Sequence, residues 1–438
     1  MKIVRFGMND VTKTLTQRRQ VFADNALLFY DEPVYFTRAQ GVWMYDANDT
    51  PYLDAYNNTV SVGHCNVEVV EAITRQASTL NSHTRYLYDT VLDYAEELLK
   101  EFPEDLSKIA FTCTGTEANE LAMRIAKETT GGDGFIVVGN AYHGCSNATA
   151  DISPYGSDGI VSASNVRALE PPNSYRLSNA EIEQNFTDGL RQCIKDVENN
   201  GHKFAALIID ATLEANGIFA IPTTYLRKSQ EIIREAGGLF IADEVQGGFA
   251  RMGDRMWSFE RHNVTPDLVT VGKPMANGLP MGGVIGTADL INHFFRQRHY
   301  FNTFGGNAVC AAAGQATLRF IQRERLLNNA RSVGKYLFDK CSKLMDKHEA
   351  IGHVRGAGLF IGIEFVEDRS SKKPAPVMAK AVMNSLRHHN ILTGLAGQFD
   401  NVLKIRPPLI FDKANADQFL DTLNLVLSLD LRPATLRP

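Results

Sequence analysis

Two short apolar runs between residues 239 and 286 each end in ionisable side chains. The first leads into Asp243 and Glu244, and the second leads into Lys273. Short runs that are apolar throughout are typical of strands buried on both faces of a parallel sheet. In an open α/β sheet, ligands bind beyond the carboxyl ends of the strands. We therefore expect Asp243 and Lys273 to face one bound molecule, and this pair is the starting hypothesis for an active site.

The alternation of apolar run, turn and helical periodicity recurs along the first two thirds of the chain. Further buried strands are predicted at residues 109–112, 135–138 and 204–210. This pattern predicts an α/β fold whose large domain has a mostly parallel central sheet with helices on both faces. Residues 151–186, rich in Pro, Ser, Asn and Gly, are expected to form a long surface excursion.

The last third of the chain has a different pattern. Helical periodicity extends from Ala308 to Lys347, and we expect two helices that meet near Arg325. Beyond them, strands at 358–365 and 402–411 and helices at 377–388 and 415–430 predict a smaller α+β domain. The expected division is an N-terminal segment of residues 1–56 that packs with the small domain, a large domain of 57–320 and a small domain of 321–438.

Composition excludes several classes of protein. The 438 residues include 45 basic and 50 acidic ones, for a formal net charge of −5, which gives no strong field for nucleic acid. We find neither a signal peptide nor an apolar run of about 20 residues, so we expect a cytoplasmic protein without a membrane span. The six cysteines are scattered without metal-ligand spacing, so no metal site is predicted.

Two strand ends carry candidate binding residues. Gly115 and Thr116 stand where a strand turns into a helix, a place where unpaired amides bind anions, although the same residue types also cap helices without binding anything. Tyr142 and His143 follow the strand at 135–138. One of these rings could stack on a flat cofactor, but most such pairs only pack in the core. Arg85 lies in a polar loop and, by composition alone, is a surface arginine.

Several motifs in a fixed order resemble the class III (omega) aminotransferases, which are fold type I enzymes that use pyridoxal 5′-phosphate. The resemblance extends through almost the whole chain, and a run near the C-terminus is similar to the subgroup of alanine-glyoxylate aminotransferase 2-like proteins and ethanolamine-phosphate phospholyases. The motifs are Gly115-Thr116-Glu117-Ala118-Asn119, Ala141-Tyr142-His143-Gly144, Ala242-Asp243-Glu244-Val245-Gln246, Gly272-Lys273-Pro274 and Val402-Leu403-Lys404-Ile405-Arg406-Pro407-Pro408.

This resemblance implies a role for each matching residue. Lys273 would form the internal aldimine with the cofactor aldehyde and then move the substrate proton, while Asp243 would pair with the protonated ring nitrogen. Val245 and Tyr142 would pack on the two faces of the ring. The remaining implied contacts with the cofactor come from Gly115, Thr116, His143, Glu214, Gln246 and, in a homodimer with active sites at its interface, Thr303 from the neighbouring subunit.

Two departures from the family pattern affect loops near the site. Ala215 stands where a proline often follows the glutamate, so the course of that loop is not fixed by the resemblance. Ala250 replaces a glycine in Gly-Phe-Gly-Arg, a change that is tolerable only if the position does not need a positive φ.

The expected reaction is transfer of an amino group from an amine or ω-amino acid to a keto acid such as pyruvate, in two ping-pong half-reactions. Arg406 resembles the family arginine that binds a carboxylate, and Arg85 is a second candidate; alternatively, Arg406 forms a salt bridge between domains. The second expected activity is a phospholyase or ammonia-lyase acting on a small phosphorylated or phosphonate amine. These arginines, with Lys404, suit a phosphate as well as a carboxylate.

Overall fold

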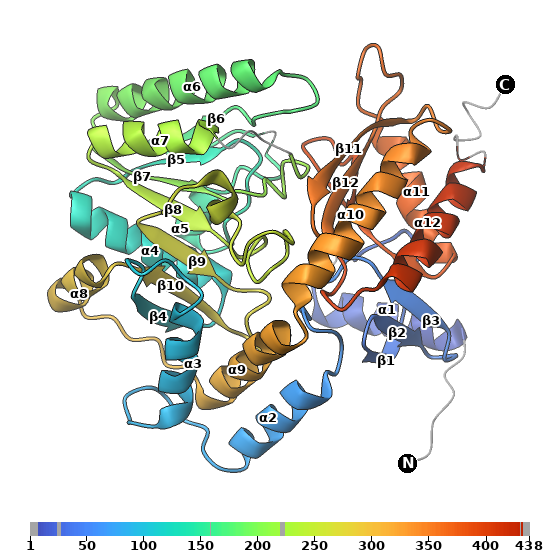
Figure 1. Cartoon of the computed structure of the whole chain (residues 1–438), viewed down its shortest axis with the longest axis horizontal. Coiled ribbons are helices and arrows are strands. Elements are labelled where there is room, and N and C mark those ends of the chain that lie inside the picture. Colours follow the sequence, from blue (N-terminus) through green and yellow to red (C-terminus); the bar gives the residue numbers. More distant parts are fainter. Residues whose placement is uncertain (1–7, 24–27, 158, 220–223, 430, 432–438) are drawn as a thin grey trace.

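The computed structural model describes residues 8–23, 28–157, 159–219, 224–429 and 431. Its largest element is a seven-stranded sheet (Figure 1) in which β10 runs antiparallel to both of its neighbours, β4 and β9, while the pairings from β9 to β6 are parallel. The expected mostly parallel sheet is confirmed. In sheet order the strands are β4 (Lys108–Thr112), β10 (Gly282–Gly286), β9 (Leu268–Val271), β8 (Leu239–Asp243), β7 (Phe204–Ile209), β5 (Gly134–Val138) and β6 (Val166–Leu169).

Helices pack on both faces of this sheet because alternate strand residues point to opposite sides. On one face, Leu207 and Phe240 join an apolar cluster with helices α6 (Asn179–Asn199) and α7 (Thr224–Glu235). On the other face, Ala206 and Ile241 join a separate cluster with α4 (Gly115–Thr130) and α8 (Ala288–Gln297). The two-sided packing leaves the strand ends as the place where polar side chains gather.

Two smaller sheets lie on the other side of the molecule (Figure 1). One is antiparallel, and the other joins the N-terminal strands to a short strand from near the C-terminus, because β13 pairs with β3. The first sheet has the order β11 (Ile351–Ala357), β12 (Phe360–Phe365), β15 (Val402–Ile405), β14 (Gly394–Ala396), and the second has the order β1 (Phe36–Gln40), β2 (Trp43–Asp46), β3 (Pro51–Asp54), β13 (Ile391–Leu392).

The remaining helices connect and cover these sheets. The long helical stretch forms two helices, as expected, and Arg325 between them has φ of 52°. The bounds are α1 (Met8–Val21), α2 (Val67–Ala77), α3 (Asp89–Leu99), α5 (Asn147–Asp151), a 3₁₀ turn η1 (Phe259–His262), α9 (Ala308–Arg323), α10 (Leu326–Leu344), α11 (Pro376–His388) and α12 (Lys413–Leu427). Among the described residues, no helix is long and apolar enough to cross a membrane.

Two expectations about strands were wrong in detail. The surface excursion at 151–186 contains β6, the edge strand of the main sheet, whose four residues are too few to show a period among polar neighbours. The strand expected at 402–411 ends at Ile405, because Pro407 and Pro408 have no amide hydrogen to donate to a ladder. The division into 1–56, 57–320 and 321–438 stays a prediction.

Candidate active site

A cavity of about 330 Å³ lies beyond the carboxyl ends of β8 and β9. Strands β7, β8 and β9 are parallel neighbours, so residues that follow them meet at one edge of the sheet. The cavity brings together most of the predicted site residues, namely Gly115, Thr116, Tyr142, His143, Asp243, Val245, Gln246 and Lys273.

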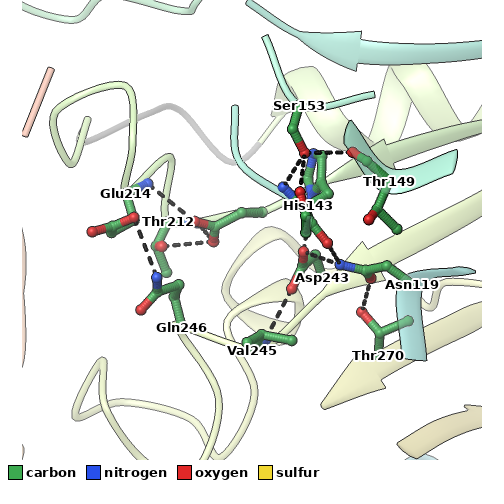
Figure 2. Close-up of polar contacts among 12 residues, drawn as sticks. Asn119, His143, Thr149, Ser153, Thr212, Glu214, Asp243, Val245, Gln246 and Thr270 are labelled. Carbon is green, nitrogen blue, oxygen red and sulfur yellow. Dashed lines mark hydrogen bonds and ion pairs between the residues drawn. The ribbon is translucent and has the colours of Figure 1, made fainter. Parts of the chain in front are cut away.

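Asp243 places a buried negative charge at the end of β8 (Figure 2). Its Oδ2 accepts hydrogen bonds from His143 Nδ1 at 2.8 Å and Asn119 Nδ2 at 2.9 Å, and its Oδ1 accepts from the Val245 amide at 3.0 Å. Burial raises the pKa of Asp243, but the hydrogen bond and charge of His143 and the bonds from Val245 and Asn119 outweigh it, so the pKa lies below its usual value. The carboxylate therefore stays ionised at neutral pH.

Lys273 follows β9 on the wall of the same cavity. Burial and the neighbouring charge of Arg406 lower its pKa, while Glu214 and Asp243 act in the opposite direction. A buried lysine with a lowered pKa loses its proton more readily and becomes a better nucleophile. The solvated surface position that most lysines occupy does not describe Lys273.

The residues at the start of α4 cap this helix and also line the cavity. Thr114 caps the helix, because its side chain accepts a hydrogen bond from the Glu117 amide at 3.1 Å. Gly115 and Thr116 themselves line the cavity. A Cβ on Gly115 would lie 2.8 Å from Val245 Cγ2, so only glycine allows this close approach of α4 to the chain after β8.

The two rings at 142 and 143 differ in their surroundings. Tyr142 is 46% exposed, lines the cavity, and lies edge to face with Tyr155 at 6.2 Å between ring centroids. His143 is buried and points its Nδ1 at Asp243, whereas its Nε2 has no hydrogen-bond partner among the described residues. His143 thus contacts the buried carboxylate directly and also forms part of the cavity wall.

Glu214 lies between two buried cations. Its Oε1 accepts hydrogen bonds from Lys404 Nζ and, at 3.5 Å, from Arg406 Nη1, and Arg406 also donates to Gln246 Oε1. Both cations approach the face of the Tyr56 ring, at 5.2 and 5.0 Å from its centroid. Burial raises the pKa of Glu214, but the charges of Lys404 and Arg406 lower it to about 2. The salt bridge expected as the alternative role of Arg406 is therefore present.

Four of the predicted site residues do not line the cavity, namely Glu214, Arg406, Arg85 and Thr303. Glu214 and Arg406 lie behind its wall and contact the cavity-lining Gln246. Arg85 lies on the Phe301 ring, with its guanidinium carbon 3.8 Å from the ring centroid, and Thr303 is exposed two residues further along. Both therefore lie on one exposed part of the surface. A contact of Thr303 with a neighbouring subunit stays a prediction.

The structure shows the backbone at both departures from the family pattern, Ala215 and Ala250. The Ala215 carbonyl accepts hydrogen bonds from Asn140 Nδ2 at 2.8 Å and the Gly397 amide at 3.1 Å, which fixes the loop without a proline. Ala250 has φ of 65°, so the condition stated for an alanine there is not met. An alanine in the left-handed backbone conformation costs about 1–2 kcal/mol of conformational free energy. Packing contacts around the fully buried Ala250 must offset this cost.

The sequence analysis gave no role to several polar residues that line the cavity, among them Asn119 and Asp210. Asn119 stands four residues after Gly115 and so lies one turn further along the same face of α4, a spacing that could have identified it. Asp210 follows β7, just as Asp243 ends β8. Burial, followed by the charge of Asp243, raises the pKa of Asp210 to about 6.

Within the described residues, no group of three or more His, Cys, Asp or Glu side chains is placed to hold a metal.

The family model described as Aminotransferase class-III matches residues 29–427. The chain belongs to this family. It is 37% identical to a Drosophila melanogaster protein named alanine-glyoxylate aminotransferase 2-like, over 93% of this chain and 85% of that one. It is 38% identical to an Arabidopsis thaliana protein named alanine-glyoxylate aminotransferase 2 homolog 2, mitochondrial, over 94% and 87%. Because that class-III relative is named as mitochondrial, the cytoplasmic location of this protein stays a prediction.

One similar solved structure is of a protein with a different named activity. A phospholyase from Arthrobacter, in complex with phosphoethanolamine, is 39% identical to this class-III chain, with a TM-score of 0.91 and coverage of 95% of this chain and 100% of that one. Relatives named as aminotransferases and a relative named as a phospholyase are therefore similar to this chain to about the same degree.

The class-III assignment implies pyridoxal 5′-phosphate as the cofactor, and the cavity fits it. The cavity wall includes an ionised carboxylate, a partly buried lysine and the start of a sixteen-residue helix with the hydroxyl of Thr116. These groups match a ring nitrogen, an aldehyde and a phosphate in turn. The buried His143 Nε2, on the same cavity wall, has no hydrogen-bond partner among the described residues and is free to contact a bound group.

Proposed function

We propose that the protein is a pyridoxal-phosphate enzyme that eliminates phosphate from a small primary amine, with phosphoethanolamine as the simplest substrate of this type. The observation that carries the proposal is the pair of buried cations Lys404 and Arg406 behind the cavity wall. Arg406 donates to the cavity-lining Gln246, and Lys404 connects to Gln246 through Glu214. Arg406 alone would suffice for a carboxylate, whereas a phosphate monoester carries close to two negative charges at neutral pH and would match both cations once Glu214 gives up its contacts with them.

The position of the pair follows from the strand. Lys404 and Arg406 are two residues apart at the end of β15, and both side chains meet Glu214 and the Tyr56 ring. Glu214 neutralises one of the two charges and thereby reduces the cost of burying them. A substrate anion would compete with the Glu214 carboxylate for the same donors, so we expect this loop to adjust when substrate binds.

The chain's own residues would divide the remaining work. The cofactor, when bound, supplies an electron-withdrawing ring to the carbon that bears the substrate's amine. Asp243 would hold the proton on the ring nitrogen, Lys273 Nζ would take the proton from that carbon, and Gly115 and Thr116 would bind the cofactor phosphate. Val245 and Tyr142 would hold the ring between them, while Gln246 and Glu214 would lie toward its 3-hydroxyl side. Thr303 of a second copy would complete the phosphate site in a homodimer.

Phosphate release tests this proposal. Phosphoethanolamine and water should give acetaldehyde, ammonia and inorganic phosphate, with no keto acid consumed. We expect multiple turnovers without pyruvate and no formation of alanine when pyruvate is added. Alanine formation that requires an amine donor and pyruvate, without phosphate release, would overturn the proposal in favour of transamination. Transamination remains the second candidate because of the relatives named as aminotransferases.

Replacing Arg406 by alanine should separate anionic from neutral amines. Removing one charged hydrogen-bonding group costs about 2–5 kcal/mol when the partner is buried, which corresponds to a loss of at least about thirtyfold in kcat/KM for a phosphorylated amine. A neutral amine of similar size makes no such contact, so its kcat/KM should fall much less. Steady-state kinetics on both substrates is the measurement, and an equal loss for both would contradict an anion-binding role.

A further inference from the structure

The Asp243 carboxylate has a second buried support besides His143 (Figure 2). Asn119, on α4, donates from Nδ2 to Asp243 Oδ2 at 2.9 Å and to the His143 carbonyl at 2.7 Å. Its own Oδ1 accepts a hydrogen bond from Thr270 Oγ1, on β9, at 2.6 Å. The side chains of Asn119, Asp243 and Thr270 are almost fully buried. The contact therefore ties the cavity-facing carboxylate to a helix and to the neighbouring strand.

The surroundings of the Asn119 amide determine its orientation. A carboxylate and a backbone carbonyl are both acceptors, so only the Nδ2 side of the amide can face them. The Oδ1 side must then find a donor in the protein interior, and the Thr270 hydroxyl supplies it. Without that hydroxyl, a buried carbonyl oxygen would lose its partner, and the amide would be free to move away from Asp243.

Several charged and titratable groups influence the ionisation of Asp243. His143 donates to Oδ2, Lys273 lines the same cavity, and Asp210, which follows β7, is a second buried acid whose pKa is raised in part by Asp243. A buried carboxylate stays ionised only if hydrogen bonds and opposite charges outweigh desolvation. Asn119 provides one of the two side-chain donors on Oδ2, and its amide is neutral at every pH of interest.

We propose that Asn119 and Thr270 form a positioning pair that holds the Asp243 carboxylate ionised and aimed into the cavity, and so sets how firmly the cofactor's ring nitrogen keeps its proton. The inference rests on the proposed role of Asp243 toward that nitrogen. Neither Asn119 nor Thr270 transfers a proton itself. Both act through Asp243, so their loss should change the cofactor's spectrum and affinity more than the fold.

The test uses the cofactor-loaded protein and two readouts other than activity. The first is the pH midpoint of the absorption change of the bound cofactor, and the second is the cofactor dissociation constant. Asn119→Ala should move the midpoint by about one pH unit, in the same direction as Asp243→Asn but by less, and should weaken cofactor binding about tenfold. Thr270→Val, which keeps the side chain's shape in the strand, should give a smaller shift in the same direction.

Two further variants separate positioning from packing. Thr270→Ser keeps the hydroxyl and should restore the wild-type midpoint. Thr317→Val removes an equally buried hydroxyl, which bonds to Ala313 in α9, and should leave the midpoint unchanged. Wild-type midpoints in Thr270→Val and Asn119→Ala, with only lower stability, would overturn the positioning pair. An unchanged midpoint in Asp243→Asn would instead overturn the proposed role of Asp243.

Discussion

Replacing Lys273 by alanine is expected to abolish multiple turnover. The lysine is partly buried on the cavity wall, and its pKa is lowered by desolvation and by the charge of Arg406, which suits a group that must lose and regain a proton. Loss of acid–base catalysis alone should reduce kcat by about 10²–10⁴-fold, and loss of the covalent attachment of the cofactor adds to this. Steady-state assays with phosphoethanolamine, and with an amine donor and pyruvate, measure the effect.

A matched control distinguishes this effect from a general loss of lysine charge. Lys195 is exposed on α6 and does not line the cavity, so Lys195→Ala should retain full activity. If Lys273→Ala kept the wild-type kcat through many turnovers, the catalytic assignment would be wrong. A variant that loses activity together with its fold is recognised by circular dichroism.

Replacing Glu214 by glutamine is expected to have the largest effect on stability. The change leaves Lys404 and Arg406 buried without their shared carboxylate, and breaking such a buried pair costs about 3–5 kcal/mol. The free energy of unfolding, measured by urea denaturation at pH 7 in phosphate-free buffer, should fall by that amount. Inorganic phosphate should recover part of the loss, because it can replace the missing anion between the two cations.

The same variant should change how stability depends on pH. The pKa of Glu214 is lowered from 4.5 to about 2, so the stabilisation from its ionised form is fully present above about pH 4.5 and is lost as the pH falls toward 2. Glu214→Gln lacks this component, so the difference from the wild-type protein should narrow over that interval. As a control, Glu183→Gln breaks the more exposed pair with Lys228 and should change stability far less. Equal stability of Glu214→Gln and the wild-type protein at pH 7 would contradict the ion cluster.

Local patterns were enough to predict the main sheet and the positions of the charged strand ends. Asp243 and Lys273 follow apolar runs whose burial on both faces is visible in the sequence, so the edge of the sheet where they meet could be inferred. The contacts of Asn119 could not be inferred in the same way, because the hydrogen bond to Thr270 depends on how α4 packs across β9. Hydrogen bonds between elements depend on tertiary packing that periodicity does not contain.

The contacts of the candidate substrate-binding residues also could not be predicted from the sequence. The substrate-binding role expected for Arg406 stays a prediction. Its partner Glu214 is 192 residues away along the chain, and only the fold brings the two together. Arg85 and Thr303 are exposed in the single chain. The contact of Thr303 with a neighbouring subunit stays a prediction, because the periodicity of one chain contains no information about a second copy.

Borohydride reduction of the cofactor-loaded protein, followed by peptide mass mapping, tests the central claim most directly. Reduction turns a reversible carbon–nitrogen double bond between a lysine and the cofactor aldehyde into a stable single bond. We predict one cofactor-derived adduct, located on Lys273 and absent from Lys273→Ala. An adduct on another lysine of the wild-type protein, or no adduct at all, would contradict the assignment of this cavity as a pyridoxal-phosphate site with Lys273 at its centre.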